Sequence, residues 1–167
     1  AGVPASSARL LTTFLSWPRL KKRGEKMLDI FDSTCILLAK AEQKHYLFTK
    51  KLLVDNDLGI TPGQMTVLYA LYKGDGMPIT EVGKKVFLDN STLTGLIDRM
   101  EKLGLVHRAP APEDRRCYCI FLTDKAREME EAVTRTMAQV EEIMTAGCSQ
   151  EEIAVFRKVL KQIYAKL

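Results

Sequence analysis

Residues 79–122 contain two short helical patterns followed by two strand-like runs, and no other stretch constrains the fold as strongly. Residues 80–87 and 90–103 are the helical patterns, and only Leu88 and Asp89 separate them. In the second pattern, apolar residues recur at helical spacing and are expected to form one buried face. These apolar residues are Leu93, Leu96, Ile97, Met100 and Leu103. A helix, a tight turn and a second helix predict a helix-turn-helix motif.

The opposite face of residues 90–103 is small and polar near its start. At roughly 100° per residue, it carries Ser91, Thr94, Gly95, Asp98 and Lys102, with Thr92 and Arg99 on its flanks. A helix in a DNA major groove needs this arrangement, because short hydroxyl side chains and the missing side chain of Gly95 allow close approach to base edges. An ordinary capped surface helix has the same pattern. The neighbouring segments are therefore needed to distinguish a DNA-reading helix from a surface helix.

A hairpin is expected to follow this helix. Gly104 tolerates left-handed dihedral angles and is expected to end the helix. Residues 105–108 and 117–122 alternate as strands do, and residues 77–79 are expected to add a short third strand. The hairpin tip contains Arg115 and Arg116, which are placed to reach a minor groove or phosphates.

The run LDNSTLTGLIDRMEKLGLV, followed by EDRRCYCIFLTDKA, resembles the winged helix-turn-helix of the MarR (multiple-antibiotic-resistance regulator) family. With the flanking helices, the resemblance covers residues 29–167. It implies a mainly α fold: a winged helix-turn-helix with a small antiparallel β wing and long N- and C-terminal dimerisation helices. It also implies a homodimeric transcriptional regulator, a repressor, that binds a palindromic operator in double-stranded DNA and releases it on a chemical signal.

The resemblance assigns DNA contacts to hydroxyl and basic side chains of this stretch. Those at or beside the bases are Ser91, Thr92 and Thr94; those on phosphates are Lys84, Lys85 and Arg99; and one of Arg115 and Arg116 enters the minor groove. Asp98 would repel a phosphate, so it is expected to pair with Lys102 four residues on, or with a wing arginine.

Three long helical patterns flank the motif, at residues 29–57, 123–146 and 149–166. The first is apolar on more than one side, which is more surface than the winged domain covers, so all three are expected to form a dimerisation layer. Between them, Thr61, Pro62 and Gln64 provide an N-cap, a first-turn proline and the third residue of a capping box, so a helix is expected to begin there. The winged domain is expected to span residues 60–122.

The net charge of +4 does not itself indicate a DNA-binding surface. Residues 1–26 hold six basic residues and one acidic residue, and the remaining 141 residues hold 19 basic and 20 acidic residues. Basic groups are therefore local to the wing and the first helix of the motif. Residues 1–26 are either an arm that folds over the dimer or DNA, or, as we favour, translated sequence upstream of Met27. Their charge follows the apolar run, which argues against a secretion signal.

Residues that carry enzyme chemistry are sparse, so no enzymatic activity or cofactor is expected. The chain has two histidines and four cysteines but no HExxH motif, CxxC motif or Gly-rich phosphate loop. Cys117 and Cys119 lack a second ligand pair, so no metal site is predicted and both are expected to be small buried side chains. No apolar run approaches the ~20 residues that cross a bilayer. A cytoplasmic protein with reduced cysteines is expected.

The chemical signal that releases the operator could be an oxidant acting on Cys35 or a small ligand. Cys35 lies in about the position of the reactive cysteine of the organic-hydroperoxide-sensing MarR regulators, and a sensor thiol needs polar partners. Where those regulators keep tyrosines, this chain has Ala39 and Thr49, with Tyr46 as a substitute. A small aromatic ligand is therefore favoured. It would bind in a crevice between the dimer helices and the winged domain, whose expected lining residues are Phe31, His45, Phe48 and Met65. A Cys35-based peroxide sensor and a winged-helix module that binds only protein are the alternatives.

Overall fold

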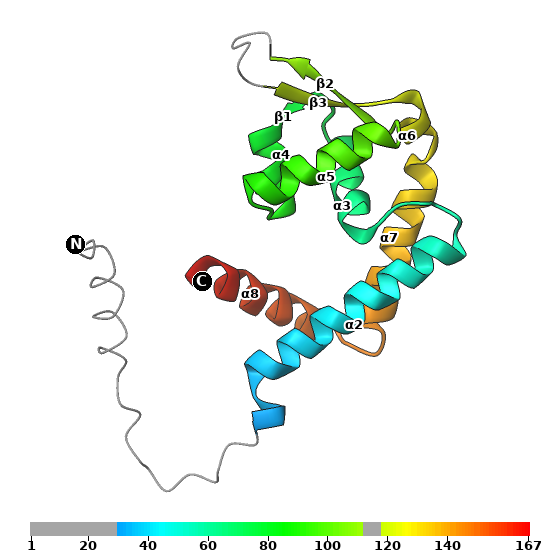
Figure 1. Cartoon of the computed structure of the whole chain (residues 1–167). Coiled ribbons are helices and arrows are strands. Elements are labelled where there is room, and N and C mark those ends of the chain that lie inside the picture. Colours follow the sequence, from blue (N-terminus) through cyan, green and yellow to red (C-terminus); the bar gives the residue numbers. More distant parts are fainter. Residues whose placement is uncertain (1–29, 112–117) are drawn as a thin grey trace, which may run out of the picture. The chain divides into compact units, whose positions relative to one another are not determined.

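The structure is a computed structural model that describes residues 30–111 and 118–167 (Figure 1). The chain divides into a unit of residues 1–39, of which residues 30–39 are described, and a compact unit of residues 40–167. The larger unit contains a helix-turn-helix, a three-stranded antiparallel sheet and further helices after the sheet. The predicted fold class, mainly α with a small antiparallel sheet, is confirmed.

The first helical segment is interrupted near its start. A 3-10 turn, η2 (Ile30–Asp32), precedes α2 (Thr34–Asp55), and Ser33 separates the two. The Ile30 carbonyl oxygen accepts from the Ser33 amide at 3.4 Å and from the Ser33 hydroxyl at 2.7 Å, so Ser33 occupies the carbonyl that an α-helix would pair with residue 34. The prediction of one uninterrupted helix over residues 29–57 was therefore wrong at its N-terminal end.

Helix α3 (Pro62–Tyr72) begins where the capping sequence predicts. The Gln64 amide donates to Thr61 Oγ1 at 3.4 Å, and the Thr61 amide donates to Gln64 Oε1 at 2.8 Å. This reciprocal pair satisfies two N–H groups that an uncapped helix would leave unpaired. The helix contacts both helices of the helix-turn-helix, the sheet and α7, which makes it the centre of the larger unit.

The helix-turn-helix consists of α4 (Ile79–Val86) and α5 (Asn90–Lys102). The two helices approach closely at Gly83. A Cβ atom there would lie 3.2 Å from the Leu88 carbonyl oxygen and 3.4 Å from Leu93 Cδ2. Because a larger side chain would push these groups apart, glycine allows the tight turn that the sequence predicts.

Two residues of the expected apolar faces point outward instead. The helical spacing of Val82, Val86 and Phe87 predicts one buried side for α4. Val82 and Val86 are buried, but Phe87 is 66% exposed. Phe87 is the C-cap of α4 and has a left-handed backbone with φ of 57°, so its side chain leaves the face that the helix would give it. Leu103 is the C-cap of α5 and is 43% exposed, although the other four residues of its apolar stripe are buried.

The sheet has the strand order β1-β3-β2 with antiparallel pairing. Its strands are β1 (Met77–Pro78), β2 (Val106–Pro110) and β3 (Tyr118–Leu122). The central strand, β3, pairs Ile120 with Met77 on one side and with Arg108 on the other. The strand pairing that a wing requires is therefore confirmed, while its tip, residues 112–117, lies outside the described residues.

The segment after the sheet contains two helices, so the prediction of one helix over residues 123–146 was wrong. Helix α6 (Asp124–Glu128) ends at Met129, and α7 (Glu130–Thr145) follows. The Met129 amide donates to the Ala126 carbonyl at 3.2 Å, three residues back, which tightens the turn and interrupts the α-helical pattern. The last helix, α8 (Gln150–Lys166), begins with a capping box of Ser149 and Glu152, which agrees with the predicted start at residue 149.

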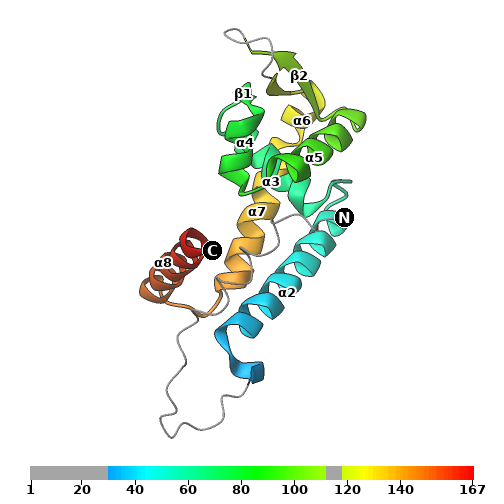
Figure 2. The ribbon, with the colours of Figure 1, turned by 60° about the vertical axis from the view of Figure 1, so that its left-hand side comes forward.

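The hydrophobic core lies beneath the helix-turn-helix and is built from α3, α4, α5, the sheet and α7. Its fully buried members include Leu68, Leu71, Val82, Leu93, Ile97, Met100, Ile120 and Val133. Figure 2 shows α7 beside the C-terminal part of α2, where the Asn56 side-chain amide donates to Thr136 Oγ1 at 2.9 Å. Helix α2 buries only Thr49 and Leu53, and α8 buries no residue. Much apolar surface on these two helices is therefore uncovered within the described chain.

Candidate nucleic-acid interface

The start of α5 is organised by the carboxylate of Asp89. Its Oδ1 accepts from the Ser91 hydroxyl at 2.5 Å and from the Thr92 amide at 2.9 Å, and its Oδ2 accepts from the Thr92 hydroxyl at 2.7 Å. These bonds, with Ser91 contributing most, hold the pKa of the fully exposed carboxyl well below its usual range. Asp89 therefore caps the helix as an anion and orients two of the hydroxyls that were predicted to face DNA.

The predicted reading face of α5 is exposed. Ser91, Thr92, Thr94 and Arg99 are all exposed in the structure. The Thr94 hydroxyl donates to the Asn90 carbonyl oxygen at 2.7 Å. Hence each of the three hydroxyl groups already donates its proton within the chain, and each oxygen keeps lone pairs that can accept a hydrogen bond from another molecule.

Glycine at position 95 leaves room for a basic group on this face. A Cβ atom on Gly95 would lie 3.6 Å from Arg99 Nη1, so the guanidinium extends along the helix surface over the glycine. In a helix, residues four apart are neighbours, and only glycine leaves this surface flat. Arg99 is therefore placed beside the hydroxyl-bearing turn.

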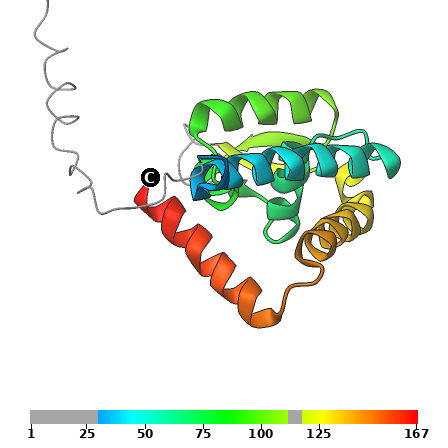
Figure 3. The same cartoon turned by 90° about the horizontal axis from the view of Figure 1, so that it is seen from below.

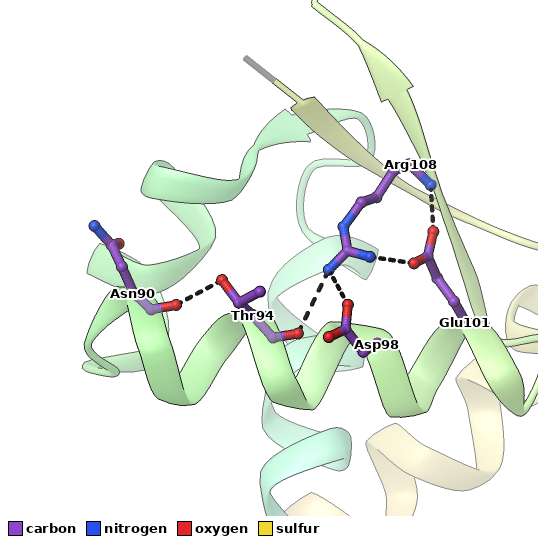
Figure 4. Close-up of polar contacts among 5 residues, drawn as sticks. All are labelled: Asn90, Thr94, Asp98, Glu101 and Arg108. Atoms are coloured by element: carbon purple, nitrogen blue, oxygen red, sulfur yellow. Dashed lines mark hydrogen bonds and ion pairs between the residues drawn. The ribbon is translucent and has the colours of Figure 1, made fainter. Parts of the chain in front are cut away.

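Arg108 of β2 joins the wing to α5 (Figure 4). Its guanidinium donates to Asp98 Oδ1 at 2.7 Å, to Glu101 Oε2, and to the Thr94 carbonyl oxygen at 3.4 Å. The Arg108 amide also donates to Glu101 Oε1 at 3.0 Å. One residue therefore binds a side chain on each of two successive turns of α5 and fixes the strand against the helix.

This contact resolves the expected pairing of Asp98. The sequence left Lys102 and a wing arginine as partners, and the structure gives Arg108, at the root of the wing. Sequence reasoning missed Arg108 because the paired arginines of the hairpin tip are the more conspicuous basic groups. A signal was present: Asp98 and Glu101 are three residues apart on one helix, and the first strand carries a single arginine that can meet both.

The structure does not bring the predicted phosphate-binding lysines together. Both are exposed on α4. Lys84 lines a hollow of about 740 Å³ beside the helix-turn-helix turn, together with Asp89 and Tyr164. The Lys85 ammonium instead lies near the turn at Gly74, where it would be 3.9 Å from a Cβ atom on that glycine. Arg115 and Arg116 lie outside the described residues.

A second hollow lies between the middle of α2, the end of α7 and the start of α8. Its volume is about 490 Å³, and its lining residues are Ala41, Lys44, His45, Phe48, Val140, Met144, Cys148 and Phe156. The predicted ligand residues His45 and Phe48 meet here. Met65 does not join them, because it is 4% exposed and belongs to the hydrophobic core. Phe31 lies in the unit of residues 1–39 and is 69% exposed.

The cysteines and their surroundings differ in exposure. Cys35 is exposed, and its Sγ lies 3.4 Å from the Ser33 hydroxyl. Cys119 is buried, as predicted for a small core side chain, and Cys117 lies outside the described residues. Thr49, at one of the positions where a tyrosine was sought, is fully buried, and its hydroxyl has no hydrogen-bond partner among the described residues.

Neither a metal-binding cluster nor a membrane-spanning helix is found in the part of the chain that the structure describes. Within residues 30–111 and 118–167, no cluster of three or more histidine, cysteine or carboxylate side chains is arranged to hold a metal ion. None of the helices in these ranges is both long and apolar enough to cross a membrane.

Comparison with known proteins identifies the winged helix. The sequence model of the MarR family matches residues 60–118. The HTH-type transcriptional regulator YsmB of Bacillus subtilis is 38% identical over 109 residues, which are 65% of this chain and 74% of YsmB. The chain belongs to the MarR family. It is thus a winged helix-turn-helix transcriptional regulator.

Solved MarR structures share this fold. A single-residue mutant of MarR from E. coli, in complex with operator DNA, has a TM-score of 0.71 at 24% identity, with 83% of this chain and 99% of that chain covered. The PcaV regulator from Streptomyces coelicolor, in complex with its natural ligand, has a TM-score of 0.70 at 24% identity, with 84% and 98% covered. These similarities establish the arrangement of helices and strands.

Proposed function

We propose that this MarR-family protein is a homodimeric repressor that binds a palindromic operator, with α5 of each subunit in a major groove. One observation carries the proposal: α5 is held from behind by the core and from the side by Arg108, while its hydroxyl-bearing face is left open. A rigid helix with short polar side chains on its free face suits the major groove. The protein acts by binding, and no catalytic step is needed.

The state of the hydroxyl groups favours particular bases. Because Ser91 and Thr92 donate to Asp89, and Thr94 donates to a main-chain carbonyl, their oxygens can only accept from DNA in this arrangement. The hydrogen-bond donors of the major groove are the amino groups of adenine and cytosine. We therefore expect adenine or cytosine where these residues approach the operator, and thymine where a threonine methyl group makes the contact.

Basic groups at the two ends of the motif provide the phosphate contacts. Lys84 lies beside the turn and Arg99 lies along α5, so they flank the hydroxyl face. Arg115 or Arg116 of the wing tip supplies the minor-groove contact. Outside residues 1–26 the chain has nearly equal numbers of acidic and basic residues, so DNA affinity must come from these few positions and not from the charge of the whole domain.

Dimerisation uses the surface that α2 and α8 leave uncovered. On α8, Val155, Phe156 and Val159 are 61%, 50% and 41% exposed, and on α2 Leu47 is 55% exposed. Soluble monomers rarely expose contiguous apolar patches of this kind. A second copy of the chain that covers them would fix two α5 helices one helical turn of DNA apart, which a palindrome requires.

The hollow lined by His45 and Phe48 is the proposed effector site. Phe48 and Phe156 provide aromatic walls, and Lys44 and His45 provide donors for an anionic or phenolic oxygen. A volume of about 490 Å³ is within the range of small-molecule sites. We infer that a small aromatic acid or phenol binds here and favours a spacing of the two α5 helices that does not fit the operator.

The test is a DNA-binding titration. A fluorescent duplex selected by the protein from a random pool should bind at low salt as one dimer per palindrome, and light scattering should give a dimer at micromolar concentration without DNA. A failure to select any sequence at low salt would overturn the proposal. It would favour the alternative in which the winged helix binds only protein. A monomer in light scattering would remove the paired α5 helices from the mechanism.

A further inference from the structure

Phe87 and Tyr164 form a ring contact between the helix-turn-helix turn and the end of the last helix. Their ring centroids are 4.7 Å apart, and the planes meet at 68°, which is the edge-to-face arrangement that aromatic pairs favour. Phe87 lies between α4 and α5, and Tyr164 lies in the last turn of α8. We propose that this pair positions α5 for DNA and that α8 is a strut between the effector hollow and the turn. The proposal rests on the proposed DNA-binding function.

The backbone of Phe87 is the first observation that supports the strut. Among the described residues other than glycine, Asp57 and Phe87 have positive φ values, of 52° and 57°. Aspartate adopts this conformation readily, whereas for a bulky aromatic residue it is a costly exception, and helices usually end on glycine there. This conformation directs the Phe87 ring away from the core and towards Tyr164. The ring contact is therefore the interaction that the strained backbone makes possible.

The attachment of α8 is the second observation. Figures 1 and 3 show α8 running from the loop after α7 back towards the α4–α5 turn. Midway along α8, Phe156 lines the effector hollow and Arg157 pairs with Glu141 of α7. Eight residues later, about 12 Å along the helix axis, Tyr164 meets Phe87. Because α8 buries no residue, these contacts at its middle and in its last turn are the ones that hold it against the rest of the described chain.

Helix α8 would transmit a movement at the hollow to the turn between α4 and α5. An α-helix is stiff over this length, so a ligand that displaces Phe156 also displaces Tyr164. The turn at Phe87 then loses its support, and α5, which starts three residues later at Asn90, changes its orientation. Coupling of this kind requires that both sites bias one element with two arrangements, and α8 is that element.

The contact is tested with two variants of one residue. Tyr164→Ala removes the ring, Tyr164→Phe keeps it, and Lys161→Ala on the same helix is a control for the loss of an exposed side chain. Hydrogen exchange without DNA should be faster over residues 83–91 in Tyr164→Ala only. Operator affinity should fall roughly 2- to 10-fold in that variant, the strength of one ring pair, with the dimer and the unfolding midpoint retained. Equal exchange and affinity in all three variants would overturn the proposal.

A thiol reagent tests the other end of the strut. Cys148 lines the hollow and is exposed, so in a Cys35→Ser, Cys117→Ser background N-ethylmaleimide would place a bulky group there. Exchange over residues 83–91 should then increase in the background protein, and the labelled Tyr164→Ala variant should show no additional increase. An unchanged rate in the background protein would contradict the coupling. Since exchange is measured without DNA, this result stands even if the proposed operator binding fails.

Discussion

The guanidinium of Arg108 donates to Asp98 at 2.7 Å, and this bond connects the wing to the helix that we propose reads DNA. The side chain of Arg108 is 22% exposed, and that of Asp98 is 51% exposed. Glu101 accepts a second bond from the same guanidinium and lies one turn further along α5. An arginine that bridges two carboxylates fixes the angle between strand and helix, which a single exposed ion pair does not do.

A double-mutant cycle should detect this bridge. With Asp98→Ala and Arg108→Ala, we expect a coupling free energy of about 0.5–1 kcal/mol in urea unfolding, because the pair is only partly shielded from solvent. The matched control is the pair of Arg135 and Glu131, whose side chains are 70% and 90% exposed, and it should couple less. Equal coupling in the two pairs would mean that Arg108 makes an ordinary surface contact.

Because of the Asp89 cap of α5, the free energy of unfolding should decrease as the pH falls into the acid range. The folded pKa of Asp89 is lowered, so its contribution is present above the unfolded value of about 3.9 and is lost as the pH falls through the folded value. Wild type should therefore exceed Asp89→Asn in stability at pH 7, and the difference should shrink below about pH 4. In an NMR titration, Ser91→Ala should move the carboxyl pKa of Asp89 upward. No movement would show that the hydroxyl does not hold the carboxylate.

Because of Tyr72, the free energy of unfolding should decrease as the pH rises into the alkaline range. Its hydroxyl donates to the Ala126 carbonyl at 2.7 Å, and burial, followed by the charge of Glu130, raises its pKa to about 12. The stability that it contributes is present below the unfolded value of about 10 and is lost as the pH rises towards 12. Tyr72→Phe should cost about 0.5–1.5 kcal/mol at pH 7 in urea unfolding. Tyr69→Phe, on the same helix, is the control and should cost less.

The elements of the winged helix could be predicted because local signals agree with the final packing. The capping sequence at Thr61, the helical stripe of α5 and the alternation of β3 each specify one structure, and each is found. The outward turn of Phe87 could not be predicted, because helical periodicity assigns it to the core and only its left-handed backbone removes it. The partner of Asp98 was also undecided, since it depends on the register between β2 and α5.

The hollow that we propose as the effector site could be predicted only in part. His45 and Phe48, two of the residues expected to line a ligand crevice, both line this hollow, because residues three apart share a face of α2. Cys148 and Phe156 also line the hollow, but they follow more than 90 residues later, and only the tertiary fold brings them to α2. Met65 was grouped with His45 from its position in the chain, but it is buried in the hydrophobic core.

Operator binding should respond differently to wing and helix substitutions. Arg116→Ala should weaken binding by about 1–3 kcal/mol if the arginine enters the minor groove. Lys84→Ala should weaken all sequences alike and reduce the dependence of log K on log salt by roughly one for each phosphate that is no longer neutralised. Anisotropy titrations at several salt concentrations measure both effects. Wild-type affinity in Arg116→Ala would remove the wing arginine from the interface.

Release of DNA is expected to follow the binding of a ligand and not the oxidation of Cys35. Cys35 is exposed, and its sulfur lies 3.4 Å from the Ser33 hydroxyl, whereas the sensing regulators that it resembles place tyrosines near their reactive cysteine. We therefore expect one equivalent of an organic hydroperoxide to leave operator affinity unchanged over minutes, in wild type and in Cys35→Ser alike. His45→Ala should instead weaken the response to an aromatic acid, because the imidazole lies in the effector hollow. Peroxide-driven release that a reductant reverses, and that Cys35→Ser abolishes, would make the thiol the sensor.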